Sequence, residues 1–536
     1  MAHKILLILA TILLFTACQS KSHEGKMIFR YNESAGIATL DPAYAKDLAL
    51  IWGCSQIYNG LIQLDTNLEV QPCIAKSWEI SPDGKVYTFT LRNDVYFHKN
   101  ELFGTPDSTR KVVAKDFEYS FQRILSPKVA SPGLWIFNDV ADNGFEAPND
   151  TTFIIRLKEP FGPFLSQLGM PYCSVVPHEV AEHYGADFRN HPCGTGPFKL
   201  QMWKEGVKLV LRRNDNYFET DETGERLPYL DAVAVTFIVD EQTQFLEFIK
   251  GNLDFMNSLK PSYKDEILTR TGQLKAKYAD RINMVSTPYL NTEYLGFLMD
   301  NTDSPLHDKR IRQALNYGFD RKKMMKYMRN NVGQPGLYGF IPYGLPGFDT
   351  TIQGFDYNPQ YAKQLLAEAD YPDGKGLPSL TLATTANYAD LCKYIQQQLN
   401  LLGFNIKVDV NPPASLREQM AQGKSTWFRG SWIADYPDAE NYLSLFYSKN
   451  KAPMGPNYTH FQNAKYDKLY EQSKRTANPE LRNSLYRQMN EILIDEAPVI
   501  VLYYDQILHF TQKNVTGLRS NAMNALDLKR VKKNSL

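Results

Sequence analysis

The sequence lacks the features that mark nucleic-acid-binding or membrane-spanning proteins. Its 59 lysines and arginines equal its 59 aspartates and glutamates, so the formal net charge is +0 and the basic surplus needed by nucleic-acid binders is missing. The only long apolar run, Ile5 to Ala17, is too short for a spanning helix, which needs ~20 apolar residues. We therefore expect neither DNA nor RNA as a partner.

Low-complexity tracts are also missing. Hydrophobic residues make up 43% and charged residues 22% of the sequence, as in an ordinary folded protein. A chain of 536 residues exceeds the size at which a single core usually keeps growing, so we expect more than one lobe.

The N-terminus has the pattern of a signal peptide. Lys4 and the apolar run are followed by Cys18 and then by a polar stretch over 19–26. The small pair Thr16-Ala17 before Cys18 resembles the lipobox of bacterial lipoproteins, although Phe15 stands where leucine is commonest. The resemblance implies a signal peptide at 1–17, lipid on Cys18 and a linker at 18–26. An ordinary secretory signal with an incidental cysteine is the alternative.

Cysteine is scarce, with six residues in all. If Cys18 is lipidated, five remain, so at least one thiol stays unpaired within a monomer. Cys173 and Cys193 flank a short connection and could form a disulfide in an oxidising compartment. Single buried thiols are the alternative.

Strands and helices alternate along the whole chain. Trp78 to Leu91 has the pattern of a hairpin around the turn Ser81-Pro82-Asp83-Gly84. Apolar residues at helical spacing predict a helix over 114–124, with Asp116 in its first turn. Further helices are predicted at 48–58, 309–319, 361–369 and 388–402. Further strands are predicted at 27–31, 152–157, 199–203, 207–212, 233–239, 380–384, 406–410 and 499–504. This pattern predicts an α/β protein.

Several short motifs then follow one another in a particular order. They are Leu40-Asp41-Pro42, Tyr58-Asn59-Gly60-Leu61-Ile62, Ala75-Lys76-Ser77-Trp78, Gly194-Thr195-Gly196-Pro197-Phe198, Asn214-Asp215-Asn216-Tyr217, Arg310-Ile311-Arg312-Gln313-Ala314-Leu315 with Asp320-Arg321, and Trp432-Ile433-Ala434-Asp435-Tyr436-Pro437-Asp438. In order and spacing they resemble the peptide/nickel-binding family (family 5) of extracellular solute-binding proteins of ABC importers. The resemblance runs nearly end to end after Cys18.

The resemblance implies a two-lobed α/β fold of the periplasmic-binding-protein type (type II, cluster C), with an extra subdomain on the first lobe. Carried over to this chain, the first lobe comprises 27–71, 193–285 and 506–536, the subdomain 72–192, and the second lobe 286–505. It also implies a monomer without cofactors, held by its lipid on the periplasmic side of a membrane. There it captures short peptides between the lobes and delivers them to the permease subunits of the importer.

Every short peptide has an ammonium group, and a carboxylate within hydrogen-bond reach offsets the cost of burying it. Peptide-binding members of the family carry an ammonium-binding aspartate at the position that Asp435 matches. The alternative is an Asx turn, because Asp435 precedes Tyr436-Pro437-Asp438.

Four neighbours of Asp435 complete the predicted site. Arg429 matches an arginine that helps meet the peptide's carboxylate in the oligopeptide binder; a structural ion pair is the alternative. Trp432 would line a pocket for a peptide side chain; the alternative is that it packs in the hydrophobic core. Ser431 and Ile433 would offer main-chain groups to an extended peptide, as in strand addition.

Two departures from the family limit what the resemblance says about the ligand. A ligand-contacting glutamate of the oligopeptide binder corresponds to the stretch Ala45-Lys46-Asp47, and a pocket tryptophan corresponds to Pro413. Ligand length and side-chain preference therefore stay open.

Motifs for other chemistry are incomplete. His178 and His183 stand five residues apart, whereas zinc binding from one helical face needs four. Gly423-Lys424-Ser425 lacks the earlier glycine of a phosphate-binding loop, since Glu418 stands there. The sequence also lacks a Gly-x-Ser-x-Gly elbow. We expect no enzyme and no metal site. A nickel chelate, haem or oligosaccharide ligand, or a role as peptide-signal receptor, remains as the alternative on the same fold.

Overall fold

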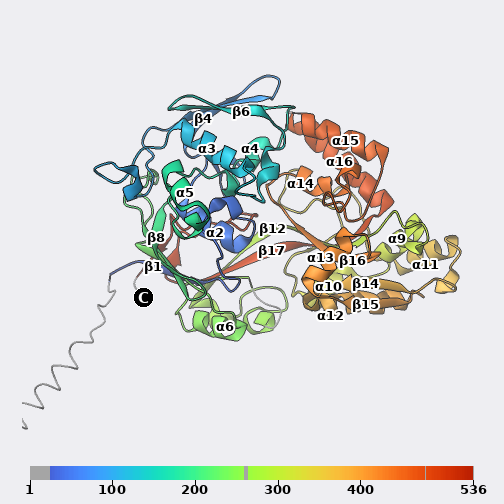
Figure 1. Cartoon of the computed structure of the whole chain (residues 1–536). Coiled ribbons are helices and arrows are strands. Elements are labelled where there is room, and N and C mark those ends of the chain that lie inside the picture. The colour runs from blue at the N-terminus through green and yellow to red at the C-terminus, as the bar shows by residue number, and fades with distance from the viewer. Residues whose placement is uncertain (1–24, 259–262, 477, 535–536) are drawn as a thin grey trace, which may run out of the picture.

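The computed structural model describes residues 25–258, 263–476 and 478–534. The predicted signal peptide and Cys18 lie outside these residues. A single 11-stranded sheet runs through the described part of the chain, in the order β15-β14-β16-β12-β17-β11-β1-β10-β9-β8, and β13 (Gln334–Pro335) pairs with β17. Two α/β halves are built on this sheet, side by side in Figure 1.

Parallel strands form the centre of the first half. β1 (Ile28–Asn32) lies between β10 (Ala232–Thr236) and β11 (Phe255–Asn257), and both neighbours run parallel to it. The antiparallel strands β9 (Lys208–Arg213) and β8 (Phe198–Lys204) extend this side of the sheet. The carboxyl ends of β1, β10 and β11 therefore meet at one edge.

Helices follow two of these strands. They are α2 (Leu48–Ile57) after β1 and α6 (Glu241–Ile249) after β10. Asp47 begins α2, since its side chain accepts a hydrogen bond from the Leu50 N–H, and Asp240 begins α6 in the same way. Shorter elements of this half are β2 (Ile62–Leu64), β3 (Val70–Pro72), α4 (Phe164–Gln167), α5 (His178–Tyr184), α7 (Lys264–Ile267), α8 (Ala276–Ala279), β18 (Val515–Thr516) and β19 (Lys532–Lys533).

A separate four-stranded sheet stands above the first half in Figure 1. Its order is β4 (Ala75–Ile80), β5 (Val86–Leu91), β7 (Thr152–Leu157), β6 (Val140–Asn149). β4 and β5 are the predicted hairpin. α3 (Ala114–Leu125) packs on this sheet through Phe117 and Phe121, whose rings lie 5.8 and 5.6 Å from that of Phe153. Asp116 accepts the Val113 N–H at 2.9 Å, as expected of its place in the first turn.

The second half combines strands with long helices. Its strands are β12 (Ile282–Phe297), β14 (Leu380–Thr384), β15 (Ile406–Val410), β16 (Trp427–Ile433) and β17 (Val499–Gln512). Its helices are α9 (Lys309–Tyr317), α10 (Arg321–Met328), α11 (Pro359–Glu368), α12 (Ala389–Asn400), α13 (Pro413–Ala421), α14 (Glu440–Leu443), α15 (Ala464–Arg475) and α16 (Pro479–Glu496).

Two long strands, β12 and β17, cross between the halves, as Figure 1 shows. They pair from Ile282↔Gln512 to Gly296↔Val499; their register breaks between Pro288 and Thr292, and a second shift follows between Glu293 and Tyr294. Before the break β17 also pairs with β11, and after it β12 pairs with β16. The broken ladder is where the connection between the halves has fewest shared hydrogen bonds, so it is the natural hinge.

The halves also touch away from the sheet. The Gly162 N–H donates to the Lys474 carbonyl at 3.1 Å. The rings of Trp135 and Tyr436 lie 6.1 Å apart. The subdomain thus reaches across to α15 and to the loop that follows β16.

The predicted two-lobed α/β fold is confirmed. The residue bounds given above for the lobes and the subdomain stay a prediction. Cys173 and Cys193 do not form a disulfide: they are buried free thiols, as are Cys54, Cys73 and Cys392. No helix among the described residues is long and apolar enough to cross a bilayer.

Candidate functional site

A cavity of about 250 Å³ lies between the first half and the loop that follows β16. The first half contributes residues of α2, the segment after it and the stretch 166–174, and the loop contributes Asp435, Tyr436 and Pro437. The C-terminal segment 521–529 closes a further side. Because its walls come from both halves, a movement of one half relative to the other would open or close the cavity.

Asp435 is the only predicted site residue that lines this cavity. Its loop is held by Asn441 of α14, whose Oδ1 accepts the Asp435 N–H at 3.1 Å and the Trp432 Nε1–H at 2.9 Å. The Asn441 amide donates to Asp435 Oδ2 at 3.3 Å. No cationic side chain of the described residues pairs with Asp435, and burial raises the pKa of its carboxyl. The cavity therefore offers an unpaired carboxylate to a cation.

Arg429 is held in an ion pair. Its Nε donates to Glu293 Oε2 at 3.0 Å, and its guanidinium lies 3.4 Å from the ring centroid of Tyr388. The Glu293 side chain is 2% exposed and that of Arg429 13% exposed. Burial raises the pKa of Glu293, an effect that Arg429 opposes. This arrangement is the structural ion pair that the sequence left as the alternative for Arg429.

A second ion pair lies beside the first. Arg329 Nη2 and Asp505 Oδ1 are 2.6 Å apart, and Arg329 Nη1 donates to the Tyr503 hydroxyl at 3.0 Å. The Asn291 amide donates to both carboxylates, at 3.2 Å to Glu293 and 3.4 Å to Asp505. The sequence analysis did not predict this network, because its members lie far apart in the chain: Arg329 and Asp505 are separated by 176 residues.

Trp432 and Arg429 lie on opposite faces of β16, because successive side chains of a strand alternate. Trp432 packs beside the hydrophobic cluster that contains Tyr294 and Phe428. It does not line the cavity, although its indole helps to position Asn441 and through it the Asp435 loop.

The main-chain groups of Ser431 and Ile433 point away from β12. The Ala434 N–H donates to the Leu290 carbonyl at 2.9 Å, and main-chain groups of successive residues in a strand alternate in direction. Residues 430 and 432 therefore bond to β12, and residues 431 and 433 face the other side. On that side β14 pairs with β16 only at Phe428, so no described strand covers residues 430–433.

Polar residues of two sequence motifs also line the cavity. Asn59 Oδ1 accepts from the Thr195 hydroxyl at 3.0 Å, and its amide donates to the Tyr217 hydroxyl at 3.4 Å. Lys529 Nζ bonds to Glu219 at 2.7 Å and to Gln63 at 2.8 Å. Sequence reasoning used these motifs to recognise the family, but it assigned no role to Asn59 or to the C-terminal segment.

The folded halves, the crossing strands and the cavity between them are the architecture of an extracytoplasmic solute-binding protein. The family model of bacterial extracellular solute-binding proteins, family 5 Middle, matches residues 69–454. The chain belongs to this family of solute-binding proteins.

Individual relatives cover nearly the whole chain. The glutathione-binding protein GsiB of Salmonella typhi is 27% identical over 492 residues, covering 90% of this chain and 90% of the relative. The dipeptide-binding protein DppE of Bacillus subtilis is 28% identical over 546 residues, covering 96% and 93%. The heme-binding protein A of Haemophilus influenzae is 29% identical over 466 residues, covering 83% and 81%.

Solved structures agree with the fold. The periplasmic binding protein DppA from Helicobacter pylori, in complex with the peptide STSA, superposes with a TM-score of 0.76 at 24% identity, covering 95% of this chain and 98% of that chain. HbpA2 from Haemophilus parasuis gives a TM-score of 0.81 at 24% identity, covering 95% and 100%.

Proposed function

We propose that this chain is the peptide-capturing subunit of an ABC importer. The observation that carries the proposal is Asp435, an unpaired carboxylate on the wall of a cavity between two lobes. A carboxylate there meets the one cationic group that every short peptide has, its terminal ammonium. Relatives named for dipeptide and glutathione binding support a peptide-like ligand.

The open edge of β16 suits the rest of an extended peptide. Main-chain groups of Ser431 and Ile433 face a side without a described strand, so a peptide could add there as a further strand. Strand addition uses hydrogen bonds to the peptide main chain and does not depend on the peptide's sequence. A carrier of varied peptides requires this independence. Trp432 would contribute by positioning the Asp435 loop.

For Arg429 we propose the structural role that the sequence left as the alternative to carboxylate binding. Its guanidinium already faces the carboxylate of Glu293, so it would meet a peptide carboxylate only by exchanging partners. We assign it to the framework under the site.

The competing hypothesis is a haem, nickel-chelate or oligosaccharide ligand. The relative named for heme binding supports the first of these. Asp435 favours the peptide, because its carboxylate lines the cavity without a cationic partner among the described residues and can form a charge-assisted hydrogen bond with an ammonium.

We also propose that the protein acts without catalytic turnover, as a monomer held to the membrane by lipid on Cys18. It would work on the periplasmic side of the cell envelope and deliver its ligand to the permease subunits.

Mass spectrometry of the purified protein tests the proposal. Ligands released by mild denaturation should be short peptides with free N-termini, and a defined peptide pool should come back intact after prolonged incubation. Release of haem or sugars in place of peptides would contradict peptide capture, and time-dependent cleavage would contradict the absence of turnover.

A further inference from the structure

A second cavity, of about 340 Å³, lies at the sheet edge where the parallel strands of the first half end. Its wall includes Asn32 and Glu33 at the end of β1, and Asn257 and Ser258 at the end of β11. α6, which follows β10, contributes Gln244 and Phe245 among others. The carboxyl ends of parallel strands in an open α/β sheet are where such proteins hold ligands.

The two cavities are neighbours. The side chain of Trp52, which is 1% exposed, contributes to the wall of both. Its indole N–H donates to the Asn524 carbonyl at 2.7 Å, so this wall is fixed in place. Only Trp52 therefore needs to separate a ligand in the first cavity from the second cavity.

Two hydrogen-bond acceptors on the wall of the second cavity have unused capacity. Asn257 Oδ1 is buried and has no hydrogen-bond partner among the described residues. The Glu33 carboxylate accepts one hydrogen bond, from the Ala35 N–H at 3.1 Å, and forms no ion pair with a described residue. Burial raises the pKa of Glu33, a cost that a bound cation would offset. Asn32, by contrast, is satisfied by Thr236 and Ile238.

The charged residues on the walls of both cavities also favour a cationic ligand. Among the described residues, neither wall includes an arginine or a histidine, and the one lysine, Lys529, is bound to Glu219. Apart from Glu241, which has a partner of its own, the carboxylates on the described walls are Glu33, Asp435 and Asp527. The described walls of the two neighbouring cavities therefore carry more negative than positive charge, which favours a ligand with more than one positive charge.

We propose that the cavity bounded by Glu33 and Asn257 is a second subsite, which takes the cationic side chain of a peptide whose ammonium is held by Asp435. The inference rests on the proposed function and deepens it: the preferred ligands are basic peptides. A lysine or arginine side chain supplies the donors that Asn257 Oδ1 and the Glu33 carboxylate lack.

Calorimetric titration of the purified full chain tests the subsite. The probes are alanine tripeptides with one lysine placed at each position in turn, and matched tripeptides in which norleucine or Nε-acetyl-lysine replaces that lysine. At one position the lysine peptide should bind about tenfold more tightly than both neutral forms, as expected for one charge-assisted contact.

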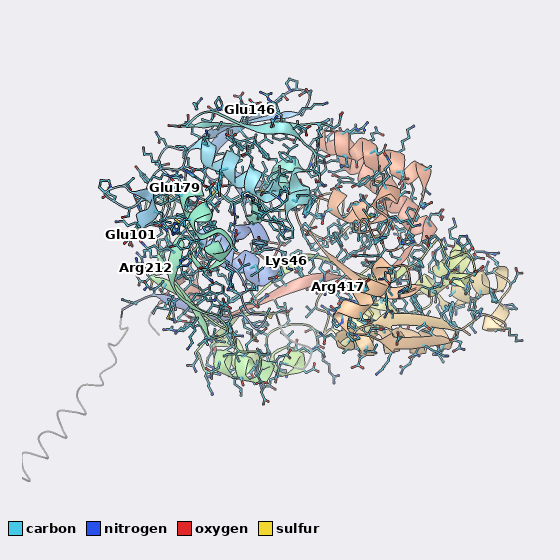
Figure 2. The ribbon with its side chains drawn as sticks, in the orientation of Figure 1. Lys46, Glu101, Glu146, Glu179, Arg212 and Arg417 are labelled. Carbon is cyan, nitrogen blue, oxygen red and sulfur yellow. The ribbon has the colours of Figure 1, made fainter. Side chains whose placement is uncertain are left out.

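Glu33→Gln should remove that preference and leave the affinity for the norleucine peptide unchanged. The matched control is Glu101→Gln, because Glu101 is exposed and distant from the cleft (Figure 2). Equal affinity for lysine and norleucine at every position would overturn the subsite in the unaltered protein, whatever the fate of the variant.

The outcomes also separate the subsite from the proposed function. If neutral tripeptides bind and lose affinity on N-acetylation, peptide capture stands even when lysine brings no gain. If none of the tripeptides binds, both fail.

Discussion

At the scale of single residues, the pKa of Asp435 is raised because burial disfavours its charged form. An ammonium ligand needs that charged form. Peptide affinity should therefore fall as the pH drops through a value above the ordinary aspartate pKa of about 3.9. Titrations between pH 4 and 7 with a peptide that lacks lysine measure this. An affinity that stays constant to pH 4 would contradict a role for the carboxylate.

The Arg429 and Glu293 pair makes a prediction about stability. Removing one partner leaves the other charge buried, so Arg429→Ala should lower the free energy of unfolding by about 3 kcal/mol. Urea denaturation measures the change. The control is Arg417→Ala on α13, since Arg417 is exposed and forms no ion pair with a described residue (Figure 2). A loss no larger than in the control would mean that Arg429 is free to serve the ligand.

Residue identities alone predicted some of the features of the site and not others. Asp435 stands out because a motif places it after a strand. The partner of Arg429 is 136 residues away, and only the pairing of β12 with β16 brings the two together. Arg312 and Arg321, part of the motifs that identified the family, are 2% exposed and donate to main-chain carbonyls such as those of Glu496 and Val501. Their role is structural, which their charge did not suggest.

At the scale of elements, the directions of the main-chain groups of β16 make its edge testable. Ile433→Pro removes an N–H that faces away from β12, so the ladder to β12 should survive. Peptide binding should weaken by about 1 kcal/mol for the lost hydrogen bond. Ile433→Val is the matched control. Thermal unfolding shows whether the Ile433→Pro variant is folded, and calorimetry measures its peptide affinity. Undiminished binding in a folded variant would argue against strand addition.

Short elements with strong periodicity were well predicted from the sequence. The strands at 152–157, 380–384 and 406–410 have the predicted bounds, and the five predicted helices differ from α2, α3, α9, α11 and α12 by at most two residues at either end. The crossing strands were not foreseen as such: 499–504 is less than half of β17, which continues to Gln512. Local pattern cannot show that one strand serves two lobes, because that depends on partners hundreds of residues apart.

At the scale of the whole molecule, attachment to the membrane depends on the N-terminus. Cys18→Ala should release the protein into the soluble fraction, since one lipid-modified residue would be the anchor. Fractionation with a high-salt wash measures this, and Cys54→Ala is the control for the loss of a buried thiol. A Cys18→Ala variant that stays with membranes would refute the lipid anchor.

Capture itself is a property of the whole molecule, because the cavity has walls from both lobes and a hinge between them. The proposed capture depends above all on Asp435 binding the ammonium group of the ligand. Asp435→Asn should weaken peptide binding by about 2 to 5 kcal/mol, the range for truncating a buried, hydrogen-bonded charge pair. N-acetylation of the peptide should cost the unaltered protein a similar amount.

The most direct measurement combines both changes by calorimetric titration of the two proteins with free and acetylated peptide. Since both changes remove the same interaction, the combined loss should be much smaller than the sum of the single losses. Strictly additive losses, or no loss in Asp435→Asn, would contradict ammonium recognition and leave Asp435 as a turn-forming residue.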